Sequence, residues 1–164
     1  MKFRDHEYHR ASLDRWRQAS RLMQDGDAYA LAMYCGGLAV ECLLRAFRWQ
    51  EDQFFDGRHD LSDLLSASKI LGINDDYMRR RGKTDEEIRE AAMEFRSAMN
   101  EIVVLWHNNL RFASEKSLKA HLVRIHRVQG VKGDPLKKNA SDLMDAVQRI
   151  VNRGFVLWDS QKKS

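Results

Sequence analysis

The sequence predicts an all-α fold, an up-and-down bundle of four main helices plus two short ones, in a single domain spanning residues 1–164. One proline and nine glycines in 164 residues leave few helix breakers. The alternation of β-branched and polar residues that is typical of strands is nearly absent. With 43% apolar residues, the chain is long enough for one core and short for two.

The first two helices are expected over residues 5–24 and 27–49. Apolar residues recur in the first at three- and four-residue steps, which places them on one face of a helix: Leu13, Trp16, Ala19, Leu22 and Met23. Gly26 lies between the two helices and suits the left-handed conformation that ends many helices. Because the connection is short, the two helices are predicted to be antiparallel neighbours.

The second of these helices, GDAYALAMYCGGLAVECLLRAF, is the most apolar part of the chain. Glu41 and Arg45 argue against a membrane span, because a charge near the bilayer centre costs roughly 2.5–3.5 kcal/mol. We therefore expect a buried central helix. Gly36 and Gly37 predict a close helix crossing, since two glycines inside a helix cost about 2 kcal/mol relative to alanine. Glu41 is expected to pair with Arg45, or to contact Arg111 across the bundle.

A short helix, LSDLLSASKIL, is expected next, with Asp60 or Ser62 as its N-cap and Gly72 at its end. Residues 73–84 are then predicted to be a loop.

Thr84 and Glu87 form an S/T-x-x-E capping box, which predicts the start of a long helix. After this helix, a break is predicted over residues 107–112 and a short amphipathic helix over residues 115–127. Residues 130–135 are predicted to be a loop, and the last helix is expected to begin at Asn139 or Ser141.

The formal net charge of +4 is unevenly distributed. Residues 116–138 contain seven Lys or Arg and one acid, Asp134. Such a cluster either binds phosphates or forms a solvated surface, and the charge alone does not separate these alternatives.

Two further features concern the compartment. Cys35 and Cys42 lie seven residues apart on one helix, too far along its axis for a disulfide, which fits a reducing environment. The N-terminal MKFRDHEYHR is polar where a signal peptide needs an apolar stretch. We therefore expect a cytoplasmic protein.

Several motifs in order resemble the HEPN domain family. The first helical pair carries Ala11-x3-Arg15-x3-Ala19 followed by the apolar helix with AVECLLRAF, which is similar to the A-x-E-x-x-L-K/R-A helix of that family. His59-Asp60-Leu61 with Leu64-Leu65 resembles its H-D-L-x-x-L turn, and Leu110-Arg111-Phe112 lies where many members carry an R-Y pair. The resemblance covers roughly residues 8 to 158.

This resemblance implies a helical bundle that usually forms a homodimer. Some HEPN domains are ribonucleases of toxin–antitoxin, abortive-infection or phage-defence systems. Others bind nucleotides, or act as partners of nucleotidyltransferases, without cleaving RNA.

The nuclease members use an Arg and a His with four to six residues between them, and a polar residue usually follows the Arg directly. The imidazole acts as general acid or base and the guanidinium stabilises charge on the phosphate. In this chain only Arg4 and His9 have that spacing, at the N-terminus and away from the family's usual position.

A second candidate lies in WHNNLRF, where the order is reversed and His107 precedes Arg111 by four residues. Residues four apart on a helix share a face, so both side chains can meet one phosphate. Asn108 and Asn109 add amide donors. The alternative is a helix C-terminus with a purely structural role.

The sequence therefore predicts a HEPN-like protein that binds RNA, nucleotide phosphates or a nucleotidyltransferase or antitoxin partner, without the standard nuclease motif. The alternatives are a metal-independent endoribonuclease using Arg4 and His9 or His107 and Arg111, and a structural interaction module. No cofactor and no metal site are expected, because the histidines lack a third ligand at suitable spacing. The residues predicted to contact phosphate, besides His107 and Arg111, are Asn108, Asn109, Lys116, Lys119 and Arg124.

Overall fold

The computed structural model describes residues 3–54 and 59–161, and within these ranges the ordered elements are seven α-helices and one 3₁₀ helix. In chain order they are α1 (Asp5–Asp25), α2 (Tyr29–Glu51), α3 (Leu61–Ala67), α4 (Ile70–Arg80), α5 (Asp85–Leu105), η1 (Asn108–Phe112), α6 (Glu115–Arg124) and α7 (Pro135–Gln161). The predicted all-α bundle is confirmed, with one more short α-helix than expected.

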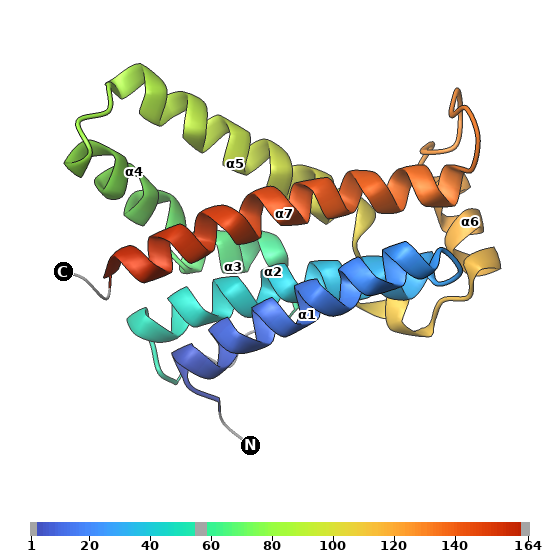
Figure 1. Cartoon of the computed structure of the whole chain (residues 1–164), viewed down its shortest axis with the longest axis horizontal. Helices are drawn as coiled ribbons and strands as arrows, with labels where there is room; N and C mark the ends of the chain where they lie inside the picture. The colour runs from blue at the N-terminus through green and yellow to red at the C-terminus, as the bar shows by residue number, and fades with distance from the viewer. Residues whose placement is uncertain (1–2, 55–58, 162–164) are drawn as a thin grey trace.

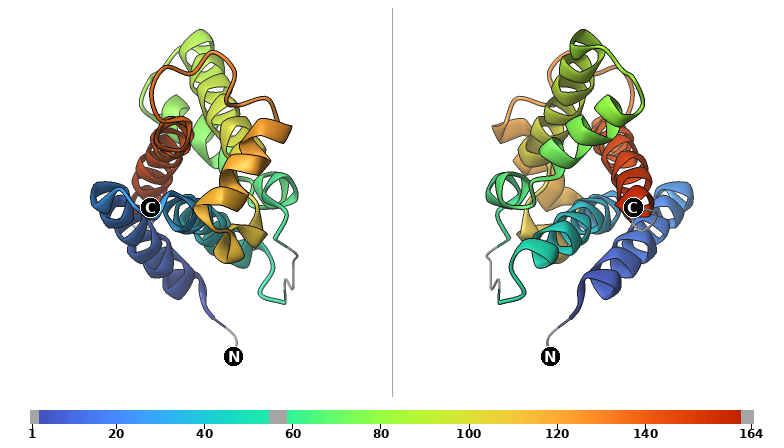
Figure 2. Two further views of the ribbon diagram at one scale, coloured as in Figure 1. Left: turned by 90° about the vertical axis from the view of Figure 1, so that its right-hand side faces the viewer. Right: turned by 90° about the vertical axis from the view of Figure 1, so that its left-hand side faces the viewer.

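The four long helices run alternately up and down. In Figure 1, α1 and α5 point one way along the bundle, while α2 and α7 point the other. Figure 2 shows α1 at one edge and α5 at the opposite edge, with α2 and α7 between them. The short helices α3, α4 and α6 pack around this frame, so α2 is enclosed on most sides.

Helix α2 is the centre of the core. Its buried side chains include Met33, Val40, Leu43, Leu44 and Phe47, each with 0% exposure. By length and composition α2 is the one helix among the described residues that is apolar enough to cross a membrane, but 72% of that apolar stretch is buried inside the bundle. Its composition is explained by the core that surrounds it.

The glycine pair of α2 lies at two close helix contacts, as predicted. A Cβ atom placed on Gly37 would lie 2.0 Å from Cδ1 of Trp106, and one on Gly36 would lie 2.9 Å from Sδ of Met144 on α7. Gly154 on α7 has the same role against Leu43. The missing side chains therefore let α7 and the end of α5 approach α2 closely.

Two of the predicted caps are present. The carboxylate of Asp60 accepts hydrogen bonds from the backbone N–H groups of Ser62 and Asp63, which makes Asp60 the N-cap of α3. Thr84 and Glu87 form the expected reciprocal capping box of α5.

The predicted loop over residues 73–84 is wrong, because most of it belongs to α4. The break comes at Lys69, whose φ of 54° is left-handed, and not at Gly72. The stripe of Ile70, Asn74 and Met78 is buried at helical spacing, and its burial offsets the cost of about 1 kcal/mol for one glycine inside a helix.

The start predicted for the last helix is also wrong. Helix α7 begins at Pro135, a residue favoured in the first turn because its missing N–H has no partner there. Asp134 Oδ1 accepts from Leu136 N–H at 2.9 Å. The amide of Asn139, one of the expected caps, instead donates to the carbonyls of Arg127 and Pro135 and fixes the preceding loop, while Ser141 lies inside the helix.

The contact between Gly37 and Trp106 gives a stability prediction. We expect Gly37→Ala to lower the free energy of unfolding by about 1–3 kcal/mol, because the added methyl group must displace a buried indole. Urea unfolding followed by tryptophan fluorescence measures this change.

Gly72→Ala is the matched control, since a Cβ at Gly72 meets nothing within 4 Å. This variant should be more stable by about 0.5–1 kcal/mol, as expected for alanine replacing glycine inside a helix. Equal effects of the two substitutions would contradict the assigned packing of Gly37.

Candidate functional site

The candidate site lies in the segment between α5 and the end of α6. Helix α5 ends at Leu105, and the buried Trp106 donates from Nε1 to the carbonyl of Tyr34 at 3.1 Å. The chain is extended at His107, which is the N-cap of η1. Ser114 then caps α6 by accepting from Ser117 N–H at 3.1 Å. These caps fix where the polar side chains of the segment point.

A pocket of about 230 Å³, here named the α6 pocket, lies between η1 and α6. Its polar lining residues are His107, Asn109, Ser117, His121 and Arg124, and its apolar ones are Leu110, Ala113 and Leu118. Ser117, His121 and Arg124 face it together because they are spaced at about one helical turn on α6. The lining contains two imidazoles and a guanidinium but no carboxylate.

The hydrogen bonds of the two imidazoles set the position of their protons. His107 Nδ1 accepts from Asn109 N–H at 3.1 Å. His121 Nδ1 lies 2.9 Å from Nη2 of Arg124, and a guanidinium can only donate. Each neutral ring therefore carries its proton on Nε2, which leaves an N–H donor for a ligand.

The pKa of His121 is lowered from its ordinary value. Burial is the main cause, and the charges of Arg124 and His107 act in the same direction. His121 is therefore neutral at neutral pH.

A second pocket of about 460 Å³, here named the α3 pocket, lies on the other side of His107 and Asn109. It is bordered by Val103, Trp106, Asn108 and the start of α3, with His59, Asp60, Leu61 and Ser62. Its one acid, Asp60, is already occupied in capping α3. His107 and Asn109 therefore form the wall between two pockets.

Glu41 binds His59, which lies two residues before the start of α3. This carboxylate is 2% exposed and lies 2.8 Å from Nε of Arg45 and 2.8 Å from Nδ1 of His59. The predicted ion pair with Arg45 is confirmed. Arg111 instead donates to Asn108 Oδ1 at 3.3 Å, so it does not serve as the partner of Glu41.

The predicted phosphate residues fall into three groups. His107, Asn109 and Arg124 line the α6 pocket. Lys116 and Lys119 are exposed on another face of α6 and do not line it. Asn108 and Arg111 bond to each other, and the Arg111 guanidinium lies over the exposed ring of Phe112 with 4.6 Å from its Cζ to the ring centroid.

The other predicted pair, Arg4 and His9, lies at the start of α1. Arg4 is exposed and is the N-cap residue, while the His9 ring stacks on Trp158 with 4.8 Å between centroids and also contacts Phe155 at 4.6 Å. His9 therefore packs between α1 and α7, where its ring contributes to the helix interface.

Two further expectations concern metals and cysteines. Within residues 3–54 and 59–161 there is no group of three or more His, Cys, Asp or Glu side chains suited to a metal ion. Cys35 and Cys42 are both free. Burial, with the nearby charge of Glu41 adding to it, raises the pKa of Cys42 to about 12, so this thiol is unreactive at neutral pH.

Comparison of the chain with protein-family models, with curated proteins and with solved structures found no match.

Sequence reasoning missed three residues of these pockets: Ser117, His121 and His59. Ser117 and His121 had a signal, because they lie on one face of the predicted short helix together with Arg124. His59 had a signal as part of the His59-Asp60-Leu61 motif, but its contact with Glu41 was not predicted. The two residues are 18 apart in the sequence, and only the tertiary fold brings their side chains together.

The Glu41 cluster gives a second stability prediction. Glu41→Gln should lower the free energy of unfolding by about 2–3 kcal/mol, because it removes the buried charge that Arg45 and His59 both contact. Chemical unfolding at neutral pH measures this change.

Asp142→Asn is the control, since it removes an exposed i,i+4 pair with Lys138 and should cost about 0.5 kcal/mol or less. If both variants lose the same small amount of stability, the contacts of Glu41 with Arg45 and His59 do not stabilise the fold as described.

Proposed function

We propose that this protein is a HEPN-like domain that binds RNA or the phosphates of a nucleotide in the α6 pocket, without the standard nuclease motif. The observation that carries the proposal is the lining of that pocket, which offers hydrogen-bond donors from two imidazoles, an amide, a hydroxyl and a guanidinium and contains no carboxylate. Such a set of donors suits an oxyanion and disfavours a cation.

The size of the pocket favours a phosphate with its sugar. Ligand pockets for drug-sized molecules are commonly about 300–1,000 Å³, and the α6 pocket is smaller, at about 230 Å³. A nucleotide or one unit of an RNA chain can therefore place its phosphate inside while the base stays outside. The exposed Lys116 and Lys119, on another face of the same helix, add positive potential that attracts further phosphates of a longer strand.

The HEPN resemblance supplies the cellular context of this proposal. Under it the protein is a cytoplasmic homodimer that acts beside a nucleotidyltransferase or an antitoxin, in a toxin–antitoxin or phage-defence setting. The ordered motifs support this reading, among them the Asp60 turn after the long apolar helix.

Substitutions on α6 test the site. We expect Arg124→Gln to weaken binding of a fluorescein-labelled single-stranded RNA of about 15 nucleotides by tenfold or more, because a charge-assisted hydrogen bond to phosphate contributes about 1.5–3 kcal/mol. Fluorescence anisotropy over a range of salt concentrations measures both the affinity and its salt dependence.

Lys116→Gln and Lys119→Gln are matched controls, because they remove the same charge from the same helix outside the pocket. Each should weaken binding by about threefold or less, while lowering the slope of log affinity against log salt by about 0.7. Equal losses for all three variants would place the RNA elsewhere, and affinity that does not change with salt would refute an electrostatic site.

The second candidate function is metal-independent cleavage of RNA, favoured by the presence of two histidines, His107 and His121, in the lining of one pocket. One imidazole, released from the hydrogen bond at its Nδ1, would take the proton of a 2′-hydroxyl as this oxygen attacks the adjacent phosphorus. The other, in its protonated form, would give a proton to the leaving 5′-oxygen. The products are a 2′,3′-cyclic phosphate and a 5′-hydroxyl, and Arg124 would stabilise the charge on the phosphate.

Incubation of the protein with structured RNA in EDTA separates the two candidates. Under the binding proposal the wild type leaves the RNA intact. Under the cleavage alternative it produces cyclic-phosphate ends, and His107→Ala and His121→Ala each abolish them. His9→Ala is the control for the N-terminal pair, because loss of cleavage in that variant alone would move the activity to Arg4 and His9.

A further inference from the structure

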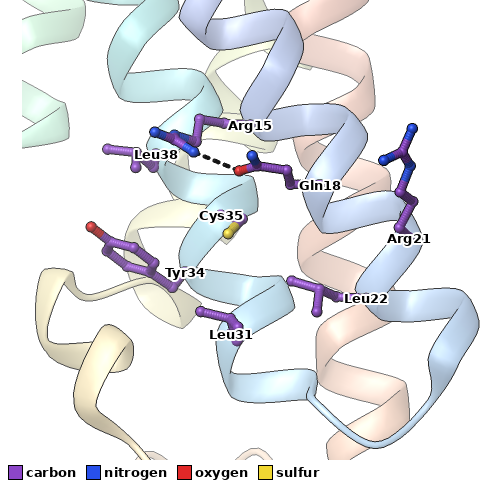
Figure 3. Close-up of a pocket in the computed structure, with 8 residues that line it drawn as sticks. All are labelled: Arg15, Gln18, Arg21, Leu22, Leu31, Tyr34, Cys35 and Leu38. Carbon is purple, nitrogen blue, oxygen red and sulfur yellow. Dashed lines mark hydrogen bonds between the residues drawn. The ribbon is translucent and has the colours of Figure 1, made fainter.

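A groove of about 520 Å³ lies between α1 and α2, away from the α6 pocket. Figure 3 shows its lining from both helices. Helix α1 contributes Arg15, Gln18 and Leu22, and α2 contributes Leu31, Cys35 and Leu38. Nothing in the α6 pocket or the α3 pocket uses these residues, so the groove requires its own explanation.

The groove runs lengthwise between the two helices. On α2 the lining residues Leu31, Cys35 and Leu38 follow the i, i+4, i+7 spacing, which covers about 10 Å of one helix face. Leu31 is 44% exposed at one end of this row. An elongated apolar floor of this kind matches the way an amphipathic helix lies in a groove.

One rim of the groove is positively charged. Arg15 Nη1 donates to Gln18 Oε1 at 2.6 Å, which orients the guanidinium along the rim. Arg21 also borders the groove, but its guanidinium extends away from the other lining side chains (Figure 3). Burial raises the pKa of the Cys35 thiol, and the positive charge of Arg15 opposes this rise. The Arg15 charge is therefore felt at Cys35, on the floor of the groove. The lining contains no acid to balance these two cations.

We propose that the α1–α2 groove binds an amphipathic helix of a partner protein, with apolar residues on the inward face and Asp or Glu beside Arg15. The apolar floor supplies the burial and the arginine rim selects acidic sequences. This surface is independent of the phosphate site, because the two share no lining residue.

A second copy of the chain is a poorer occupant than an acidic partner. In a two-fold dimer the same surface meets itself, so the Arg15 rim of one protomer would approach the basic α1 surface of the other. The α1 surface beside the groove adds Arg17 against a single acid, Asp14, which increases this repulsion. Charge complementarity therefore favours a different, acidic chain.

A pair of peptides tests the proposal with the full chain. The probe is a fluorescein-labelled helical peptide of about 15 residues with leucines at i, i+4 and i+7 and glutamates on the flanks, and its twin carries lysines in place of the glutamates. We expect the glutamate peptide to bind at least tenfold more tightly than its twin. Leu31→Glu should reduce its affinity at least tenfold, and Arg15→Glu should shift the preference toward the lysine peptide.

Met93→Glu is the control, because Met93 is a 68% exposed apolar residue on α5, which does not line the groove, and its replacement should leave binding unchanged. Equal affinity for both peptides, no binding of either, or binding that Leu31→Glu leaves intact would overturn the proposal. Sedimentation analysis adds a further outcome. A wild-type dimer that Leu31→Glu dissociates would show that a second copy occupies the groove.

Discussion

The close contact between Gly37 and Trp106 fixes the position of everything that follows α5. The indole lies where a side chain on Gly37 would lie, and its Nε1 donates to the carbonyl of Tyr34 on the same helix. The end of α5 is thereby fixed against the middle of α2. His107 comes directly after Trp106, so the wall between the α6 and α3 pockets is placed by a packing contact inside the core.

Helix α2 organises its surroundings through both its small residues and its one buried acid. Gly36 and Gly37 leave room for the close approach of α7 and Trp106, while the carboxylate of Glu41 binds Arg45 and His59. A carboxylate in a core is costly unless it is paired and hydrogen-bonded. Arg45 reaches Glu41 from the same helix, and His59 reaches it from just before α3. The buried Glu41 therefore helps to position the residues at the start of α3, which border the α3 pocket.

Much of the fold was predictable from local signals. The Asp60 cap, the Thr84 capping box and the glycine pair each have a chemistry that is complete within a few residues or within one helix. Gly72 misled because a single glycine is a weak breaker, and the burial of Ile70, Asn74 and Met78 outweighs its cost. Tertiary packing, which no local pattern displays, decided that segment.

The candidate site was predictable only in part, because its residues come from two segments joined by turns. His107, Asn109 and Arg124 were found one by one from residue type, but their common pocket depends on how η1 and α6 meet. The same geometry divides the basic residues of α6. Arg124 faces the pocket, whereas Lys116 and Lys119 face solvent on another side of the helix.

A basic segment in the sequence thus contains two kinds of cation, which act on a ligand in different ways. A guanidinium in a pocket can fix a phosphate by directed hydrogen bonds, while exposed ammonium groups mainly raise the local concentration of polyanions. Arg15, at the rim of the α1–α2 groove, is a third kind of cation, because it borders an apolar floor. In that setting we expect it to favour an acidic protein surface over an isolated phosphate. Net charge alone does not distinguish these roles, whereas the surroundings of each side chain do.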